Sequence, residues 1–212
     1  MKSLTAAVVM IGLMSGGAQA ATVFADNFDA DRTGAKRDFD RFLQFTVSDG
    51  TVDYMRQGTY KLSCAGGKGG CVDLDGSTLD AGVMTSTAFA LTKGATYTIN
   101  FDLAGNGRVK SSDSVSFGIT GGLFDGAVNA IAWNQLFQTY TYSFVAARTG
   151  RESFFIGTEG GDYFGPLLDN VLISESNVPT AAPELPSVPL PATLPLLAGG
   201  IAAAGLLRRR KS

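Results

Sequence analysis

Apolar and polar residues alternate with a period of two through most of the chain between residues 21 and 176. In the clearest segment, Tyr97, Ile99 and Phe101 alternate with Thr98 and Asn100, and similar patterns occur at 114–119 and 137–144. Successive side chains of a β-strand point to opposite faces, so each segment predicts a strand with one face in a core. Further strands are predicted at 42–47, 51–55, 59–63, 83–91, 153–158 and 167–174.

Glycine-rich turn signals separate these segments, at 49–50, 105–107, 121–122 and 160–161. No segment shows the 3.6-residue apolar period of a helix. About ten strands without helices predict an all-β fold, a single antiparallel β-sandwich of the jelly-roll type. The predicted sandwich domain spans 21–176.

The N-terminus has the pattern of a cleavable signal peptide over residues 1–20. Lys2 precedes an apolar run at 4–14, and small residues end the segment at Ala18 and Ala20. This order of charge, apolar core and small residues predicts cleavage between Ala20 and Ala21. The run is too short for a bilayer core of about 30 Å. The alternative is a buried N-terminal strand.

The C-terminus has the pattern of a linker followed by a membrane-inserted tail. Prolines at 179, 183 and 186 predict an extended linker at 177–187. An apolar segment at 192–207 then precedes the basic cluster 208–211. As a helix this segment is about 24 Å long, a marginal membrane span whose basic end would stay in the cytoplasm. Two alternatives remain open: temporary anchoring before processing, or a permanent anchor.

One short motif makes the tail recognisable. It consists of Val188, Pro189, Leu190, Pro191 and Ala192. With the apolar segment and the arginines, the tail 188–212 resembles the VPLPA variant of the PEP-CTERM sorting domain. That resemblance implies processing by an exosortase, an inner-membrane-anchored precursor, and delivery to the cell surface or extracellular matrix. It belongs to bacteria that secrete exopolysaccharide, and it gives the chain no catalytic role of its own.

The middle of the chain carries a looser resemblance. Segments 70–77, 97–105 and 165–171, in that order, resemble the galactose-binding-like jelly rolls often found ahead of such tails. This implies a β-sandwich, in a family where many members bind carbohydrate and others are structural. Many members also hold a structural Ca²⁺ where the first and last strands meet. Carried over, Asp169 and Asp26 would be its ligands; the alternative is that Asp169 bonds a neighbouring turn without metal.

Charge and the absence of histidine exclude several functions. Without Lys2 and the cluster 208–211, 12 of the 17 basic residues remain against 19 acidic ones, a net charge of −7. Such a domain repels nucleic acid and anionic lipid. The sequence contains no histidine, which excludes Ser-His-Asp and Cys-His catalysis. Paired carboxylates remain possible, and Asp73 and Asp75 are placed to share one strand face; the alternative is a strand edge and turn.

Cys64 and Cys71 are the only cysteines and flank a glycine-rich loop. In an exported protein such a pair indicates a disulfide, and two free thiols are the alternative. Closing so short a loop would stabilise the fold by roughly 2.5 kcal/mol on the chain-entropy model. A zinc site lacks further ligands.

Aromatic residues are the candidates for contact with a sugar. Tyr163 and Phe164 lie among glycines at a predicted loop tip, and Trp133, the only tryptophan, precedes a strand on whose edge it could instead pack. Tyr54 and Tyr60 are further candidates for an exposed ring. The net negative charge predicts a neutral, hydroxyl-rich ligand, because anionic sugars would be repelled without a calcium bridge.

These observations predict a non-catalytic, exported surface or matrix protein that binds carbohydrate, with extracellular polysaccharide as partner. One alternative is a structural or adhesive protein that contacts other proteins. The other is a glycoside hydrolase, which would need two facing carboxylates about 5 to 9 Å apart in a cleft.

Overall fold

A computed structural model describes residues 20–176 of the protein. The elements in order are β1 (Ala20–Asp26), β2 (Phe45–Ser48), β3 (Asp53–Arg56), η1 (Thr59–Lys61), η2 (Ala65–Gly67), β4 (Gly70–Asp73), β5 (Val83–Ser86), β6 (Phe89–Leu91), β7 (Thr96–Ala104), β8 (Ser112–Ile119), β9 (Phe124–Ala132), β10 (Gln138–Val145), β11 (Gly150–Glu152), β12 (Phe154–Thr158) and β13 (Leu167–Ser176), where η marks a 3₁₀ turn. The predicted signal segment 1–19, the linker and the sorting tail lie outside the described residues.

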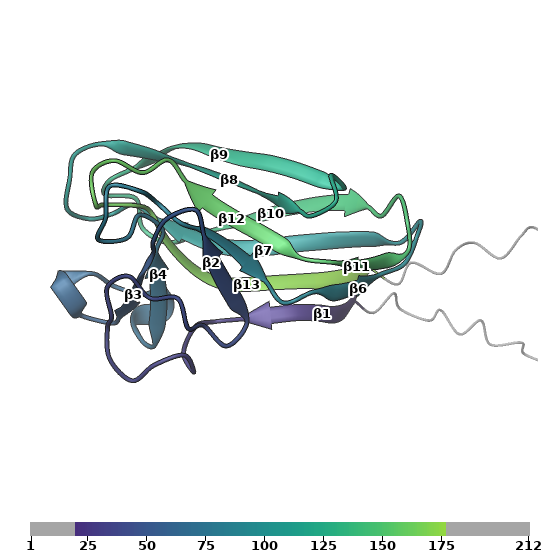
Figure 1. Ribbon diagram of the computed structural model, residues 1–212, viewed down its shortest axis with the longest axis horizontal. Helices are drawn as coiled ribbons and strands as arrows, with labels where there is room; N and C mark the ends of the chain where they lie inside the picture. Colours follow the sequence, from purple (N-terminus) through teal and green to yellow (C-terminus); the bar gives the residue numbers. More distant parts are fainter. Residues whose placement is uncertain (1–19, 177–212) are drawn as a thin grey trace, which may run out of the picture. The chain divides into compact units, whose positions relative to one another are not determined.

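Two antiparallel sheets form a sandwich, as the alternation predicts. The larger sheet has the order β10-β7-β13-β4-β3, with β1 also paired to β13, and the smaller has the order β2-β5-β12-β8-β9. A two-stranded ribbon of β6 and β11 completes the described strands. Figure 1 shows β8 and β9 in one layer and β7, β13 and β1 in the other. No helix among residues 20–176 is long and apolar enough to cross a membrane.

The core between the sheets consists of the apolar residues that the alternation pointed inward. Tyr97, Ile99 and Phe101 of β7 are fully buried. The Phe101 ring meets Phe117 of β8 edge to face, with ring centroids 4.8 Å apart. Burial of such rings supplies the main stabilisation of a sandwich. The all-β, two-sheet prediction is therefore confirmed.

Two local predictions are wrong, and one long strand was missed. The segment 59–63 forms the 3₁₀ turn η1, in which Tyr60 has a φ of 51°, a left-handed conformation that no strand accommodates. The predicted strand 83–91 is two strands, because the chain leaves β5 after Ser86 and re-enters a different sheet as β6. Strand β9 was not predicted: it has a bulge against β8, and Ala130 has a φ of 56°.

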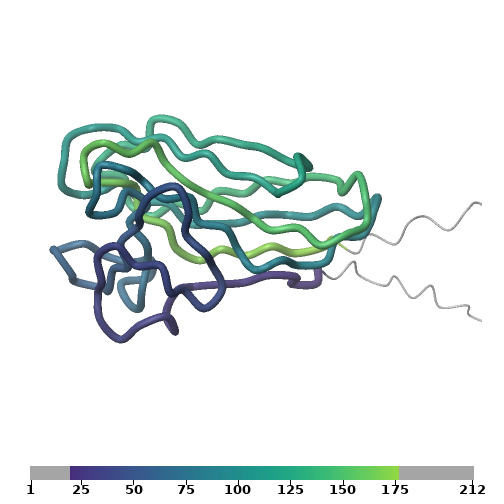
Figure 2. Tube along the Cα trace, viewed as in Figure 1, coloured from purple at the N-terminus to yellow at the C-terminus, as the bar shows by residue number. Residues whose placement is uncertain are grey.

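The end of the sandwich beside β3 and β4 carries most of the irregular chain. Figure 2 shows the segment between β1 and β2 crossing this end. The Tyr54 hydroxyl fixes that segment by donating to the carbonyl oxygens of Phe28 and Arg32, at 2.9 and 3.0 Å. A hydroxyl cannot donate its single proton to both at once, so the two acceptors share it. This end is therefore built by long-range contacts.

The predicted disulfide between Cys64 and Cys71 is confirmed, with the Cα atoms 5.5 Å apart. Both cysteines are buried. The bridge joins the segment that contains η1 and η2 to strand β4, and the backbone N–H of Gly70 donates to Asp29 Oδ1 at 2.8 Å. The covalent link thereby restrains the turn that carries Tyr60.

Candidate functional site

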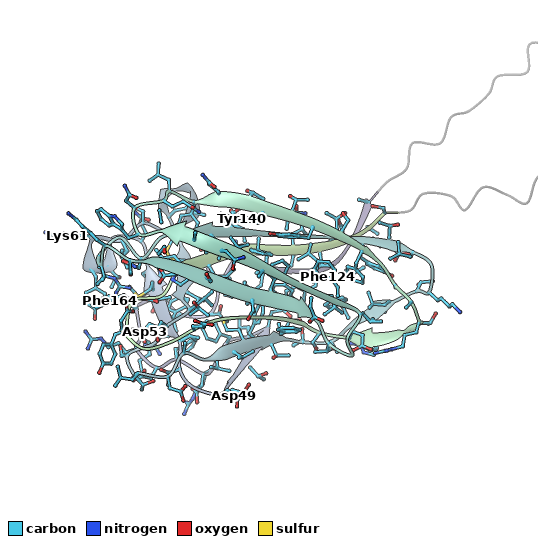
Figure 3. All side chains as sticks on the ribbon, turned by 90° about the horizontal axis from the view of Figure 1, so that it is seen from above. Asp49, Asp53, Lys61, Phe124, Tyr140 and Phe164 are labelled. Carbon is cyan, nitrogen blue, oxygen red and sulfur yellow. A yellow bond between two sulfur atoms is a disulfide. The ribbon has the colours of Figure 1, made fainter. Side chains whose placement is uncertain are left out.

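Loops from five parts of the chain meet around a hollow at this end of the sandwich, which we call the loop-end pocket. Its volume is about 520 Å³, and it is lined by Arg37, Asp53, Tyr60, Ser77, Arg108, Tyr163 and Phe164. Figure 3 shows Phe164 and Asp53 near each other at one end of the molecule. The volume lies in the range of pockets that hold small ligands.

Three aromatic rings face this pocket while remaining accessible to solvent. Tyr60 is 52 % exposed and Tyr163 is 45 % exposed, and Phe164 is half-buried. Tyr60 and Tyr163 both have a left-handed backbone, with φ of 51° and 67°. A bulky residue in that region is uncommon and is held only by surrounding structure. Both tyrosines are therefore held at the surface in a backbone conformation that costs energy.

Two guanidinium groups in the pocket lining are each stacked on an aromatic ring. The Arg108 guanidinium lies 4.6 Å from the Phe164 centroid, and the Arg37 guanidinium lies 5.5 Å from the Tyr60 centroid. Arg37 Nε also donates to the Tyr60 hydroxyl at 3.2 Å. Such stacking is favourable and fixes the planes of both groups. The pocket thus combines flat apolar faces with N–H donors.

Buried carboxylates hold the loop that carries Tyr163 and Phe164. Asp73, at the end of β4, accepts the Gly165 N–H at 2.9 Å and forms an ion pair with Arg108. Asp75 accepts the Asp162 N–H at 3.4 Å, a long contact. Asp73 and Asp75 therefore position this loop. This agrees with the alternative that they belong to a strand edge and turn, and it does not favour a pair of catalytic carboxylates.

Burial also changes the acidity of Asp73. The side chain is fully buried, and desolvation raises its pKa to about 7, although the Arg108 guanidinium acts in the opposite direction. Desolvation disfavours the charged form of a carboxyl, and an opposite charge favours it. The two effects oppose each other, and the burial effect is the larger.

The carboxylate in the pocket wall already accepts three hydrogen bonds from the protein. Asp53 is 5 % exposed. It accepts the Ser77 hydroxyl at 2.8 Å, the Ser77 N–H at 3.1 Å and the Asp38 N–H at 2.9 Å. Its remaining capacity to accept from a ligand is therefore small. Within the described residues, Asp53 is the single carboxylate that lines this pocket.

The predicted ligand residues do not all come together. Tyr163 and Phe164 line the pocket, and Tyr60, a further candidate, joins them. Trp133 does not line it. The tryptophan is half-buried, and Lys110 Nζ lies 6.0 Å from its ring centroid. Arg37, Asp53, Ser77 and Arg108 carried no signal in the sequence, because only the tertiary fold brings them to the rings.

A second hollow, the outer-face groove, lies on the solvent side of the larger sheet. Its volume is about 800 Å³, and its lining residues are Ala25, Asp26, Asn27, Ala30, Leu43, Gln44, Asn100, Asp102, Thr139, Asn170, Val171 and Leu172. Asp102 accepts the Thr139 hydroxyl at 2.5 Å and the Asn170 amide at 2.7 Å. Asp102, Thr139 and Asn170 thus satisfy one another, and no aromatic ring is among the lining residues.

The two predicted calcium ligands lie on paired strands. Asp26 ends β1, which pairs with β13, and Asp169 lies in β13. Asp169 accepts the N–H groups of Ala65 and Asn170 at 3.0 and 2.7 Å. One oxygen of Asp26, Oδ2, is buried without a hydrogen-bond partner. Burial raises the pKa of Asp26 to about 6 and that of Asp169 to about 7.

These residues supply one free carboxylate oxygen, whereas Ca²⁺ takes six to eight oxygen ligands. Among residues 20–176, no three acidic, cysteine or histidine side chains are grouped so as to hold a metal ion. The fit is partial, and calcium binding stays a prediction.

Comparisons with known proteins give a fold likeness only. No protein-family model matches the chain, and no curated protein matches it. Among solved structures, the chain is similar to a carbohydrate-binding module of lichenase 5A from Cellvibrio mixtus in complex with cellotriose, with 16% identity and a TM-score of 0.40 over 72% of this chain and 96% of that one.

Two further solved structures show the same level of likeness. The C-terminal carbohydrate-binding module of LamC from Zobellia galactanivorans has 14% identity and a TM-score of 0.40, over 72% of this chain and 98% of that one. The K1 cleaved adhesin domain of Lys-gingipain from Porphyromonas gingivalis W83 has 14% identity and a TM-score of 0.46, with the same coverage. Likeness at this level transfers no residue role to this chain, so function must be inferred from the site.

Proposed function

We propose that the domain is a non-catalytic carbohydrate-binding module that holds a sugar in the loop-end pocket. The observation that carries this proposal is the convergence of three accessible aromatic rings with two guanidinium groups around one hollow. An aromatic face stacks on the apolar C–H face of a sugar ring, and N–H donors bond its oxygens. The accessible rings and N–H donors thus supply both kinds of contact that a sugar needs.

The same pocket does not favour hydrolysis. A glycoside hydrolase needs two carboxyl groups facing each other across the scissile bond. Asp53, the single carboxylate in the described lining, is held by Ser77 and Asp38, while Asp73 lies beneath the loop in an ion pair. Binding without catalysis is the function this arrangement supports.

Titration calorimetry of the purified chain with neutral and acidic oligosaccharides tests the proposal. We expect weak binding, because a shallow site buries little area per sugar, and repeated ligands compensate through multivalency. Tyr163→Ala should lower the affinity about tenfold, the loss of one stacking contact of about 1.4 kcal/mol. Leu136→Ala, at an 83 % exposed position outside the pocket lining, is the control. Absence of binding at millimolar sugar would refute the proposal.

The outer-face groove supports the second candidate, contact with another protein. Leu43 is 67 % exposed and Leu172 is 37 % exposed among its lining residues, and its polar side chains Asp102, Thr139 and Asn170 are bonded to one another. Exposed apolar residues beside a satisfied polar surface are typical of protein interfaces. Sugar binding that is lost in Leu172→Ala but kept in Tyr163→Ala would place the sugar in this groove and would count against both the loop-end pocket and a protein interface here.

We further propose that the chain is exported and sorted by an exosortase, and that the mature protein acts at the cell surface or in the extracellular matrix. The support is the order of motifs at both ends, above all Val188–Ala192 followed by the arginine cluster. Intact-mass measurement of exported protein should give a chain that starts at Ala21 and lacks residues 208–211. Recovery of the arginine cluster in surface material would favour a permanent anchor.

A further inference from the structure

We propose that the loop-end pocket selects a sugar that carries a carboxylate, a uronic acid, and that Arg37 is the residue that recognises the acid. The inference rests on the proposed function, because it names the ligand class of the same pocket. It reverses the expectation of a neutral ligand, which the net charge of the domain suggested.

Arg37 has no acidic partner in the described part of the chain. The ion pairs there join Arg41 to Asp40, Arg108 to Asp73, and Arg148 to Glu152. The one hydrogen bond of the Arg37 side chain within residues 20–176 runs from Nε to the Tyr60 hydroxyl. Both terminal nitrogens therefore keep their N–H donors for a ligand.

The geometry of Arg37 suits a carboxylate. Its Nε bond and its stacking on Tyr60 restrain the guanidinium plane at the edge of the pocket. A planar guanidinium with restrained orientation can donate two parallel N–H bonds to a carboxylate, and such charge-assisted pairs are stronger than neutral hydrogen bonds. A sugar hydroxyl offers only one acceptor atom to these two N–H groups, so it binds Arg37 less tightly than a carboxylate does.

The neighbouring carboxylates do not compete for this position. Asp53 accepts three donors from Ser77 and Asp38. Asp38 Oδ1 accepts the Ser77 N–H at 3.1 Å, and Asp73 is paired with Arg108. Asp38 shares this N–H with Asp53, and none of the three acids forms an ion pair with Arg37 within residues 20–176. The Arg37 charge is therefore left to an incoming acid.

The net charge of the domain acts at longer range. At physiological ionic strength the Debye length is about 8 Å, so charges beyond that distance are largely screened. A direct contact with Arg37 is screened much less. Local pairing should therefore outweigh the repulsion from the remaining acidic surface, and the sign of the net charge does not decide which sugar the pocket accepts.

The test uses matched sugars and titration calorimetry on the full chain. The probes are oligomers of galacturonic acid, their methyl esters, and galactose oligomers of equal length, without added calcium. We expect the acid to bind at least tenfold more tightly than the ester or the neutral sugar. Arg37→Gln should bring the three affinities together, and Arg41→Gln, which removes an exposed arginine outside the pocket lining, should leave the preference unchanged.

Each other outcome has a defined meaning. Equal affinity of the wild type for acid and neutral sugar overturns the uronic-acid inference and leaves the carbohydrate-binding proposal in place. A loss of both affinities by the same factor in Arg37→Gln means that Arg37 only supports Tyr60, which also overturns it. Absence of binding by all three probes overturns both proposals. Arg37 is exposed, and matching melting temperatures would confirm that the variant folds.

Discussion

The loop-end pocket and the outer-face groove differ in how their polar groups are satisfied. The groove is the larger, about 800 Å³ against 520 Å³. It lies on regular strands, where Thr139 and Asp102 are opposite one another in register and bond each other. The pocket is built largely from loops that present aromatic rings and the terminal N–H groups of Arg37, which bond no other group within residues 20–176. On the proposed function, free N–H donors and exposed rings, rather than volume, distinguish the loop-end pocket as the sugar site.

The largest predicted difference between the two regions is in stability. Asp73→Ala removes the acidic partner of the largely buried Arg108 and the acceptor for Gly165. Above pH 7, where Asp73 is ionised, breaking a buried ion pair in this way typically costs about 3–5 kcal/mol. In the groove, Asp102→Ala removes two hydrogen bonds from a half-buried residue and should cost about 1 kcal/mol. Chemical denaturation of both variants measures the difference, and equal losses would contradict it.

The disulfide should matter to the pocket and not to the groove. Replacing Cys64 and Cys71 together by Ala should lower the free energy of unfolding by about 2.5 kcal/mol. It should also weaken sugar binding, because the turn that carries Tyr60 loses its covalent restraint. Denaturation and calorimetry check the two effects. The Cys64 N–H also donates to Gln57 Oε1 at 2.9 Å. Unchanged stability and affinity would show that this bond and the bond from Gly70 to Asp29 hold the turn without the disulfide.

The buried Asp73 predicts a particular pH dependence. Its folded pKa of about 7 exceeds the value of 3.8 for an exposed aspartate. Between these values the folded chain keeps a proton that the unfolded chain has released, so the free energy of unfolding should fall as pH rises from about 4 to 7. One such proton gives a slope of at most about 1.4 kcal/mol per pH unit.

Asp73→Asn provides the control for this dependence, because an amide does not titrate. Its stability should vary less with pH than that of the wild type over the same range, as measured by urea denaturation at fixed pH values. Identical slopes in the two proteins would mean that Arg108 keeps Asp73 ionised throughout. Any fall in the free energy of unfolding with rising pH would then have to come from other buried acids.

Calcium gives the smallest expected effect, because Asp26 offers one free oxygen and Asp169 is already bonded. An ion that binds only the native state stabilises that state by mass action. We predict that a chelator lowers the melting temperature of the wild type by a few degrees and leaves Asp169→Ala unchanged. Coincident melting curves in chelator and in excess calcium would count against a site.

The sequence predicted the sandwich because alternation determines which face of a strand is buried. Segment 96–103 became β7 with Ile99 and Phe101 fully buried. The prediction failed where local geometry overrode pattern: Tyr60 follows a period of two and yet lies in a 3₁₀ turn with a left-handed backbone. In this segment the period of two agrees with the burial of Leu62, but it indicates neither the exposure of Tyr60, which is 52 %, nor the backbone conformation of the turn ahead of Cys64.

The pocket was predictable only in part, for a related reason. Tyr163 and Phe164 were candidates because glycines surround them in the sequence. Arg37 and Arg108 lie far from them along the chain and resemble any other surface arginine. Their role depends on the stacking on Tyr60 and Phe164, which is a product of the fold. Tertiary contacts, rather than any local sequence pattern, bring the arginine N–H donors and the aromatic rings together.

Mapping backbone amide shifts by NMR during a sugar titration tests the central claim most directly. The account predicts that the shifting amides cluster at 36–38, 58–62, 106–110 and 161–165, around the loop-end pocket. It also predicts that the outer-face strands β7 and β10 stay unchanged. Shifts concentrated at 98–102, 139–143 and 170–172, with a silent loop 161–165, would place the sugar in the groove and contradict the account.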